Sequence, residues 1–204
     1  MPPERRTQAD RSASTRSALV DAARPLFAQE GFNAVGTERI VRRAGVTRGA
    51  LYHQFTDKVE LFVAVFEAVE QDVTDRLVEA VAAAAADAPT DVGDVLGAGI
   101  DAWLDVCADG EVQQIVLVDG PAVLGWERWH ELGLRYGAGL VSSLLEESMA
   151  AGSIPRQPVG PLAHVLIGAL DEGVLYVARS ADPVTARTEV RAVLRRLVAV
   201  ATGP

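Results

Sequence analysis

Apolar residues recur at three- and four-residue spacings along most of the chain, a pattern that predicts amphipathic helices. One such stripe predicts a helix over residues 15–30 that stops at Gly31, and its members are Leu19, Ala22, Ala23, Leu26 and Phe27. No segment alternates between apolar and polar residues as a half-buried strand does, and no internal repeat is apparent. We therefore predict an all-α protein.

Residues 37–58 have the layout of two short helices joined by a turn, followed by the start of a third helix. Thr37 can cap the first of them, and Gly45 can end it in the left-handed conformation. Thr47 can cap the second. The apolar residues that this arrangement directs inward are Ile40, Val41, Ala44, Leu51 and Phe55.

The second of these short helices presents four residues outward: Arg48, Gly49, Tyr52 and His53. A guanidinium, a phenol and an imidazole beside a glycine that permits close approach suit a DNA major groove. We therefore interpret the segment as a recognition helix. The alternative is that two amphipathic helices joined by a glycine turn simply form part of an all-helical core.

The runs LVDAARPLFAQEGFNAVGTERIVRRA and GVTRGALYHQFTDKVELFVAVFE closely resemble the amino-terminal domain of the tetracycline-repressor (TetR) family of transcriptional regulators. The resemblance covers residues 15–68. It implies a helix-turn-helix domain of three helices, joined through a fourth helix to a larger helical domain for ligand binding and dimerisation, with about nine helices in all. It also implies DNA contacts by Thr37, Arg42, Arg43, Thr47, Arg48, Gly49, Tyr52, His53 and Lys58. Gln54 departs from the family pattern, in which an aromatic residue often precedes the phenylalanine.

Three parts of the chain are expected on these grounds. Residues 1–14 are polar and arginine-rich and read as a flexible arm, residues 15–68 form the DNA-binding domain, and residues 69–204 form the ligand-binding and dimerisation domain. A helix beginning near Asp57, where Asp57 and Glu60 resemble a capping box, links the two domains.

Composition and charge agree with this organisation. A chain of 204 residues with 49% hydrophobic residues can bury a substantial core. No apolar run approaches the roughly 20 residues of a membrane span, and the first residues lack the apolar core of a secretory signal, so we expect a cytoplasmic protein. A single cysteine, Cys107, excludes an internal disulfide and a multi-cysteine zinc site.

The net charge of −9 is unevenly distributed. Residues 1–58 carry 10 Lys and Arg against 6 Asp and Glu, a net charge of +4, whereas residues 59–204 carry 9 against 22, a net charge of −13. Basic charge is therefore concentrated at the end that we expect to meet DNA phosphates. Lys58, the only lysine, lies at the start of the linking helix, where we expect it to contact a phosphate.

Two helices, over residues 161–179 and 183–202, carry more apolar surface than peripheral helices need. Burial within one subunit would explain it, but the TetR resemblance implies pairing with a second copy as a four-helix bundle. We therefore expect a homodimer on a near-palindromic operator. The candidate interface residues are Gly168, Ala169, Gly173, Val190, Leu194, Leu197 and Val198.

The resemblance implies that the larger domain binds an inducer, and we expect this inducer to be a small apolar molecule. Aromatic and polar residues in this half suggest an apolar cavity with a few polar groups, and the candidates are Trp103, Cys107, Trp126, Trp129, His130, Tyr136, His164 and Tyr176. Each aromatic residue could equally belong to the core. Asp171 and Glu172 could cap such a cavity, face water or bond across an interface.

An enzyme is the competing class of protein. Three histidines are dispersed through the chain, and no nucleophile elbow, phosphate loop or paired-histidine metal motif accompanies them. A grouping of Cys107 with a histidine and an acid could form only in the fold. We therefore predict no catalytic site, metal or cofactor, and a ligand-responsive repressor. A DNA-binding dimer without an inducer is the main alternative.

Overall fold

The computed structural model describes residues 8–87 and 92–203, and all regular structure within these ranges is helical. The amino-terminal part comprises α1 (Gln8–Glu30), α2 (Thr37–Ala44), α3 (Arg48–Gln54) and the start of α4 (Lys58–Asp87). The remainder comprises α5 (Val92–Val106), α6 (Gly110–Val112), the π-helix η1 (Gln113–Asp119), α7 (Gly120–Leu124), α8 (Trp126–Ala150), α9 (Val159–Arg179) and α10 (Pro183–Thr202). Because α6, η1 and α7 are contiguous, the described residues form nine helical segments, and the all-α prediction is confirmed.

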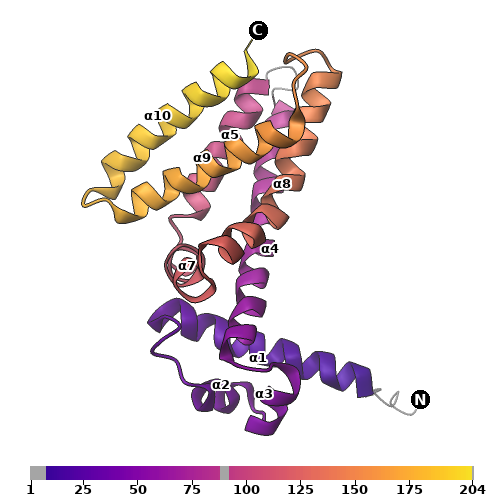
Figure 1. The fold of residues 1–204 in the computed structure, drawn as a ribbon, viewed down its shortest axis with the longest axis vertical. Coiled ribbons are helices and arrows are strands. Elements are labelled where there is room, and N and C mark those ends of the chain that lie inside the picture. The colour runs from indigo at the N-terminus through magenta and orange to yellow at the C-terminus, as the bar shows by residue number, and fades with distance from the viewer. Residues whose placement is uncertain (1–7, 88–91, 204) are drawn as a thin grey trace.

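The molecule is elongated (Figure 1). Helices α1, α2 and α3 lie at one end, and α4 runs lengthwise from them into a bundle with α5, α8, α9 and α10. The α6–η1–α7 segment lies between the two ends and contacts both α1 and α4. Helix α4 crosses the expected domain boundary at residue 68 without a break, so the exact division remains a prediction.

Three phenylalanines form the centre of the small domain. Phe27 of α1, Phe32 of the following loop and Phe62 of α4 have ring centroids 5.2 to 5.7 Å apart, and none is more than 9% exposed. These distances are typical of favourable aromatic pairs. Burial of the three rings therefore fixes α1 and the loop before α2 against α4.

The turn between α2 and α3 has the expected chemistry. Gly45 ends α2 with a φ of 67°, and the Thr47 hydroxyl caps α3 by accepting a 3.1 Å hydrogen bond from the Ala50 N–H. Thr37 does not cap α2, which corrects the prediction. The extended residue before the helix is Gly36, so Thr37 is already helical and its hydroxyl lies past the capping position.

The first turn of α4 is capped as expected. Asp57 accepts a 2.8 Å hydrogen bond from the Glu60 N–H, and the Glu60 carboxylate accepts one from the Thr56 N–H. This exchange resembles a capping box in which the return bond reaches one residue further back. It fixes the point at which the linking helix leaves the small domain.

The expected arm is partly helical. Helix α1 begins at Gln8, so residues 8–14 are not an arm, and residues 1–7 lie outside the described part of the chain. Gln54 of α3 donates a 2.8 Å hydrogen bond to the Ser12 hydroxyl, and the Arg16 guanidinium lies 4.4 Å from the centroid of the Phe55 ring. These tertiary contacts hold the first turns of α1 beside α3. The spacing of apolar residues in the sequence does not predict them.

Helix α7 starts at Gly120 and continues through Pro121 to Leu124, and the chain breaks at Gly125, with a φ of 77°. Pro121 lies in the first turn of α7, where a missing N–H is tolerated. Gly120 is needed for close packing, because a Cβ there would lie 2.7 Å from Trp129 Cδ1 and 3.1 Å from Phe66 Cε2.

Helix α9 is the one described helix that is long and apolar enough, by length and composition, to cross a membrane. Core helices of soluble proteins also meet that test. In this fold α9 packs against α8 and α10 and carries Asp171 and Glu172 near its middle. We therefore treat it as a helix of the bundle.

Replacing Gly120 with alanine tests the packing of α7 against α8. We expect Gly120→Ala to lower the free energy of unfolding by about 1–3 kcal/mol, because the new methyl group collides with the Trp129 ring. Gly139→Ala in α8 is the control, since no atom lies within 4 Å of the added Cβ, and a gain of about 0.5–1 kcal/mol is expected there. Equal effects of the two changes in urea unfolding would contradict this packing.

Candidate DNA-binding surface and ligand cavity

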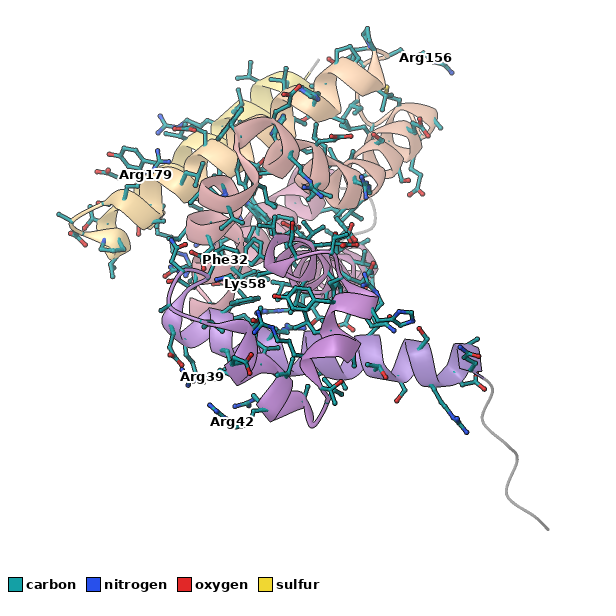
Figure 2. All side chains as sticks on the ribbon, turned by 60° about the horizontal axis from the view of Figure 1, so that its bottom comes forward. Phe32, Arg39, Arg42, Lys58, Arg156 and Arg179 are labelled. Carbon is teal, nitrogen blue, oxygen red and sulfur yellow. The ribbon has the colours of Figure 1, made fainter. Side chains whose placement is uncertain are left out.

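The end of the molecule formed by α2 and α3 is basic and exposed. Figure 2 shows Arg39 and Arg42 at this end, whereas Arg156 and Arg179 lie in the opposite domain. Of the nine residues expected to contact DNA, seven are exposed here, namely Arg42, Arg43, Thr47, Arg48, Gly49, Tyr52 and His53. Thr37 is half-buried at the start of α2. The structure therefore brings eight of the nine together around the recognition helix.

Arg48 is held at the surface by two weak contacts. Its guanidinium lies 3.1 Å from the Glu38 carboxylate and 5.6 Å from the centroid of the Tyr52 ring. Both partners in the ion pair are more than 60% exposed, so the pair is screened by water and stabilises the fold little. A base or phosphate can therefore replace Glu38 at little cost.

Lys58 is placed differently from the other basic residues. Its ammonium donates hydrogen bonds to the carbonyl oxygens of Phe32, at 2.9 Å, and Val35, at 3.0 Å, and lies 3.9 Å from the centroid of the Phe32 ring (Figure 2). Burial lowers the pKa of Lys58, and the charge of Asp119 opposes that shift. The side chain thus holds the loop between α1 and α2, a role that the sequence did not indicate.

A cavity of about 730 Å³, including its opening, lies among α4, α5, η1, α8 and α9. Four of the eight residues predicted for a ligand site line it: Trp103, Trp129, His130 and Tyr136. Most of the remaining wall is aliphatic. The prediction of an aromatic, largely apolar cavity therefore describes part of its surface.

The other four candidates lie elsewhere. Cys107 is buried beside a separate pocket near α10, Trp126 and Tyr176 are each 57% exposed, and His164 is exposed. Trp126 still touches the site indirectly, because its ring stacks on His130 with centroids 5.9 Å apart. Burial raises the pKa of the Cys107 thiol, which opposes a role as a nucleophile.

Two acidic residues from different helices line the cavity, and their spacing in the sequence does not indicate that they lie together. Glu70 of α4 is 5% exposed, and the Asp171 side chain of α9 is 17% exposed. Burial raises the pKa of each carboxyl to about 7, and the charge of Asp171 adds to the effect on Glu70. A place at the mouth of a cavity was one of three alternatives for Asp171. Glu70 was not a candidate, because it lies in a helix where acidic and apolar residues are mixed.

His130 completes this polar group. Its Nδ1 is buried without a hydrogen-bond partner and lies 3.9 Å from Asp171 Oδ2, which is too long for a hydrogen bond. Within the described ranges, no group of three or more His, Cys, Asp or Glu side chains is arranged to hold a metal ion.

The residues predicted for a dimer interface are mostly internal. A Cβ at Gly173 would lie 2.9 Å from Val190, and Leu194 and Val198 are at most 8% exposed, so these four pack α9 against α10 within one chain. The close approach predicted from glycine therefore occurs within the subunit. Leu197 is 39% exposed, a Cβ on Gly168 would meet no atom within 4 Å, and Ala169 is half-buried.

The cavity and the small domain are joined by direct contacts through η1. The Trp129 indole donates a 2.8 Å hydrogen bond to the carbonyl of Val116, and both residues line the cavity. At the end of η1 the buried Asp119 accepts a 2.7 Å hydrogen bond from the Phe32 N–H. The two bonds place one short π-helix between the cavity wall and the loop that Lys58 holds.

Arg24 makes a second connection between the small domain and the rest of the molecule. Arg24 of α1 donates to both oxygens of Glu111, at 2.9 and 2.6 Å, and to Asp72 of α4 at 2.6 Å. The hydrogen bond to Glu111 is the main reason that the pKa of Arg24 is raised. A forked pair of this kind fixes orientation as well as distance.

Comparison with known proteins gives family matches over most of the chain. Residues 19–65 match the model of the tetR family of bacterial regulatory proteins, and residues 94–200 match a tetracyclin repressor-like C-terminal domain. The Transposon Tn10 TetC protein of Escherichia coli is 26% identical over 161 residues, which is 79% of each protein. The transcriptional repressor BepR of Brucella suis is 35% identical over 112 residues, covering 55% of this chain and 51% of BepR.

Solved structures extend the likeness to the whole fold. The crystal structure of a TetR-family transcriptional regulator from Pectobacterium atrosepticum superposes with a TM-score of 0.81 at 27% identity, covering 98% of this chain and 99% of that one. The regulator RolR in complex with resorcinol has a TM-score of 0.74 at 19% identity, over 96% and 91% of the two chains. At that identity, the likeness to RolR concerns the fold alone.

The Glu70→Gln variant tests the burial of the cavity carboxyls. A glutamate in the unfolded chain has a pKa near 4.3, whereas folded Glu70 has a pKa of about 7. The folded state therefore holds a proton that the unfolded state loses, and the stability of the parent falls as pH rises through this window and stays reduced above it. We expect the variant to exceed the parent by about 1–3 kcal/mol at pH 8 and by much less at pH 5.

Urea unfolding at the two pH values measures this difference. Glu79→Gln is the control, because it makes the same change at an exposed position of α4. A gain for Glu70→Gln that is equal at both pH values would show that its carboxyl titrates normally.

Proposed function

This chain belongs to the TetR family of transcriptional regulators, and from that premise we propose that it is a homodimeric repressor that leaves a near-palindromic operator when a small molecule fills the cavity. The observation that carries the proposal is the pair of hydrogen bonds that joins the cavity wall through η1 to the loop before α2. Such a regulator acts on DNA in the cytoplasm, and its family and relatives are not enzymes.

For DNA contact we assign base reading to Arg48 and phosphate binding to Thr37, Arg42, Arg43 and Tyr52. Arg48 is exposed on the outer side of α3, and its fork of donors matches the two acceptors of a guanine edge. Thr47, Gly49 and His53 flank it on the same short helix. We withdraw Lys58 from this set, because its ammonium already donates to two carbonyls and to no outward group.

The dimer proposal now rests on the outer faces of α9 and α10. On α10, Val193 is 58% exposed, Leu197 is 39% exposed and Val200 is 82% exposed. These residues lie within about 60° of each other around the helix and form one apolar stripe. Val165 and Tyr176 extend a similar exposed stripe along α9, with the open Gly168 between them. Two such faces would bury each other across a two-fold axis.

Coupling between the two sites follows from the contacts of η1. A ligand that moves Trp129 or Val116 pulls on the carbonyl that the indole bonds, and the same π-helix carries Asp119. A shift of Asp119 changes the position of the Phe32 backbone and, through Lys58, the loop that precedes α2. In a dimer this displacement alters the spacing of the paired recognition helices, and a coupling of about 1–3 kcal/mol would suffice to release DNA.

The Arg48→Ala variant tests base reading. On a duplex selected from random sequences by the parent protein, we expect its preference over unrelated DNA to fall by about tenfold, since one bidentate base contact is worth about 1–3 kcal/mol. Arg156→Ala removes the same charge from the opposite domain (Figure 2) and should bind as the parent does. Fluorescence anisotropy at two salt concentrations makes the comparison. Unchanged preference in Arg48→Ala would remove α3 from base reading.

The Val193→Asp variant tests the proposed dimer face. The parent should sediment at twice the 21.6 kDa chain mass, and Val193→Asp at the chain mass itself, because the new carboxylate would be buried unpaired at the interface. Val184→Asp is the control. Val184 is 78% exposed and lies nine residues earlier, on the opposite side of α10, so this variant should remain a dimer. A monomeric parent at micromolar concentration would refute the dimer.

A further inference from the structure

The cavity wall contains two carboxyl groups that accept no hydrogen bond from the residues that the structure describes. Glu70 is 5% exposed, yet within the described part of the chain neither its carboxylate nor that of Asp171 accepts a hydrogen bond, and the nearest candidate donor, His130 Nδ1, lies 3.9 Å from Asp171 Oδ2. Buried carboxyl groups normally have partners, because losing water without compensation is costly. The oxygens of Glu70 and Asp171 are not among the fully buried unpartnered atoms, so they are open to the cavity and available to a ligand there.

Three of the donors in the wall are already engaged by backbone carbonyls. The Trp103 indole donates to the carbonyl of Leu170 at 3.3 Å, the Trp129 indole donates to that of Val116 at 2.8 Å, and the Thr74 hydroxyl donates to the Glu70 carbonyl at 2.9 Å. No lysine or arginine lines the cavity. The wall therefore offers a ligand negative charge and hydrogen-bond acceptors, together with the faces of aromatic rings.

We propose that the cavity binds an organic cation, with a protonated amine or quaternary ammonium placed against the carboxylates of Glu70 and Asp171. The rings of Trp103, Trp129 and Tyr136 suit such a group as well, since aromatic faces attract cations most strongly where water is excluded. This inference rests on the proposed function in taking the cavity as the regulatory site, and it names the chemical class of the ligand.

An anionic ligand would face two carboxylates with no lysine or arginine in the wall to offset them. A neutral apolar ligand would fill the space but leave both acids without a partner. A cation is the class that relieves the carboxylates and uses the aromatic wall. The earlier expectation of a small apolar inducer therefore becomes an amphiphile whose polar end is positively charged.

An adjoining pocket extends the site for the rest of such a molecule. It has a volume of about 590 Å³ including its opening, is lined by apolar residues and a glycine, and shares four wall residues with the first cavity: Leu77, Leu140, Val141 and Leu170. The carboxylates lie only in the first cavity. A cationic head with an aliphatic tail matches this division between an acidic end and an apolar end.

Three probes with one tail and different heads test the charge. We expect octyltrimethylammonium to bind about tenfold or more tightly than 1-octanol, and octanoate to bind most weakly, because only the first is attracted by both carboxylates. Tetramethylammonium should bind more weakly than octyltrimethylammonium because it lacks the tail. Quenching of tryptophan fluorescence and calorimetry report binding directly. Equal affinities for the three octyl probes would overturn the proposal.

Isosteric variants locate the charge. Glu70→Gln and Asp171→Asn should each weaken octyltrimethylammonium binding about tenfold, and the double variant should prefer 1-octanol. Glu79→Gln, at an exposed site on α4, should bind as the parent does. Circular dichroism and the melting temperature confirm that each variant folds. A folded double variant that still prefers the ammonium probe would refute the assignment.

The pH dependence gives a separate readout. Octyltrimethylammonium does not titrate, so its affinity should rise between about pH 5 and about pH 8 as the carboxyls lose their protons. The titratable groups that face them are His130 and Tyr136 of α8 and the buried Cys107, which follows α5. The His130→Gln variant should keep the trend, and its loss there would assign the trend to the imidazole instead.

Operator release is measured separately from binding. If the ammonium probe binds with the expected variant pattern but does not release DNA, the ligand class stands and the proposed induction fails. If 1-octanol or octanoate releases DNA while the ammonium probe neither binds nor releases it, induction stands and the cation assignment fails.

Discussion

The buried carboxylate of Asp119 connects the two halves of this protein. It accepts a 2.7 Å hydrogen bond from the Phe32 N–H, and its charge opposes the effect of burial on the pKa of Lys58, which bonds the same loop. A carboxylate with so little exposure is stable only while these partners stay in place. The position of α2 and α3 relative to the larger domain therefore depends on where η1 holds Asp119.

Helix α4 gives the second connection between the sites. Lys58 at its first residue holds the loop before α2, and Glu70, twelve residues later, lines the cavity. At 1.5 Å per residue the two residues are about 18 Å apart along the axis of one continuous helix. A ligand that neutralises Glu70 thus acts on the same rigid element that supports the DNA-binding surface. The contacts of η1 run beside it, so the cavity reaches the small domain by two routes.

Sequence periodicity placed the helices well, because each amphipathic stripe must face a core whatever its neighbours are. The predictions from sequence were wrong where a residue could contact either of two partners. Gly173 allows another helix to approach closely, as expected, but the helix that does so is α10 of the same chain. Lys58 stands at the expected position, but its ammonium turns to backbone carbonyls. Residue type set the kind of contact in both cases, and the fold selected the partner.

Local spacing, capping and charge specify the all-α class, the helix-turn-helix layout with its Gly45 stop and Thr47 cap, and the basic end of the chain, so these features could be predicted from the sequence. Which residues share the cavity depends instead on how the helices pack. Glu70 and Asp171 lie about a hundred residues apart, and the packing of α4 against α8 and of α8 against α9 brings them to one wall. Contacts between distant segments arise from packing, which periodicity does not encode.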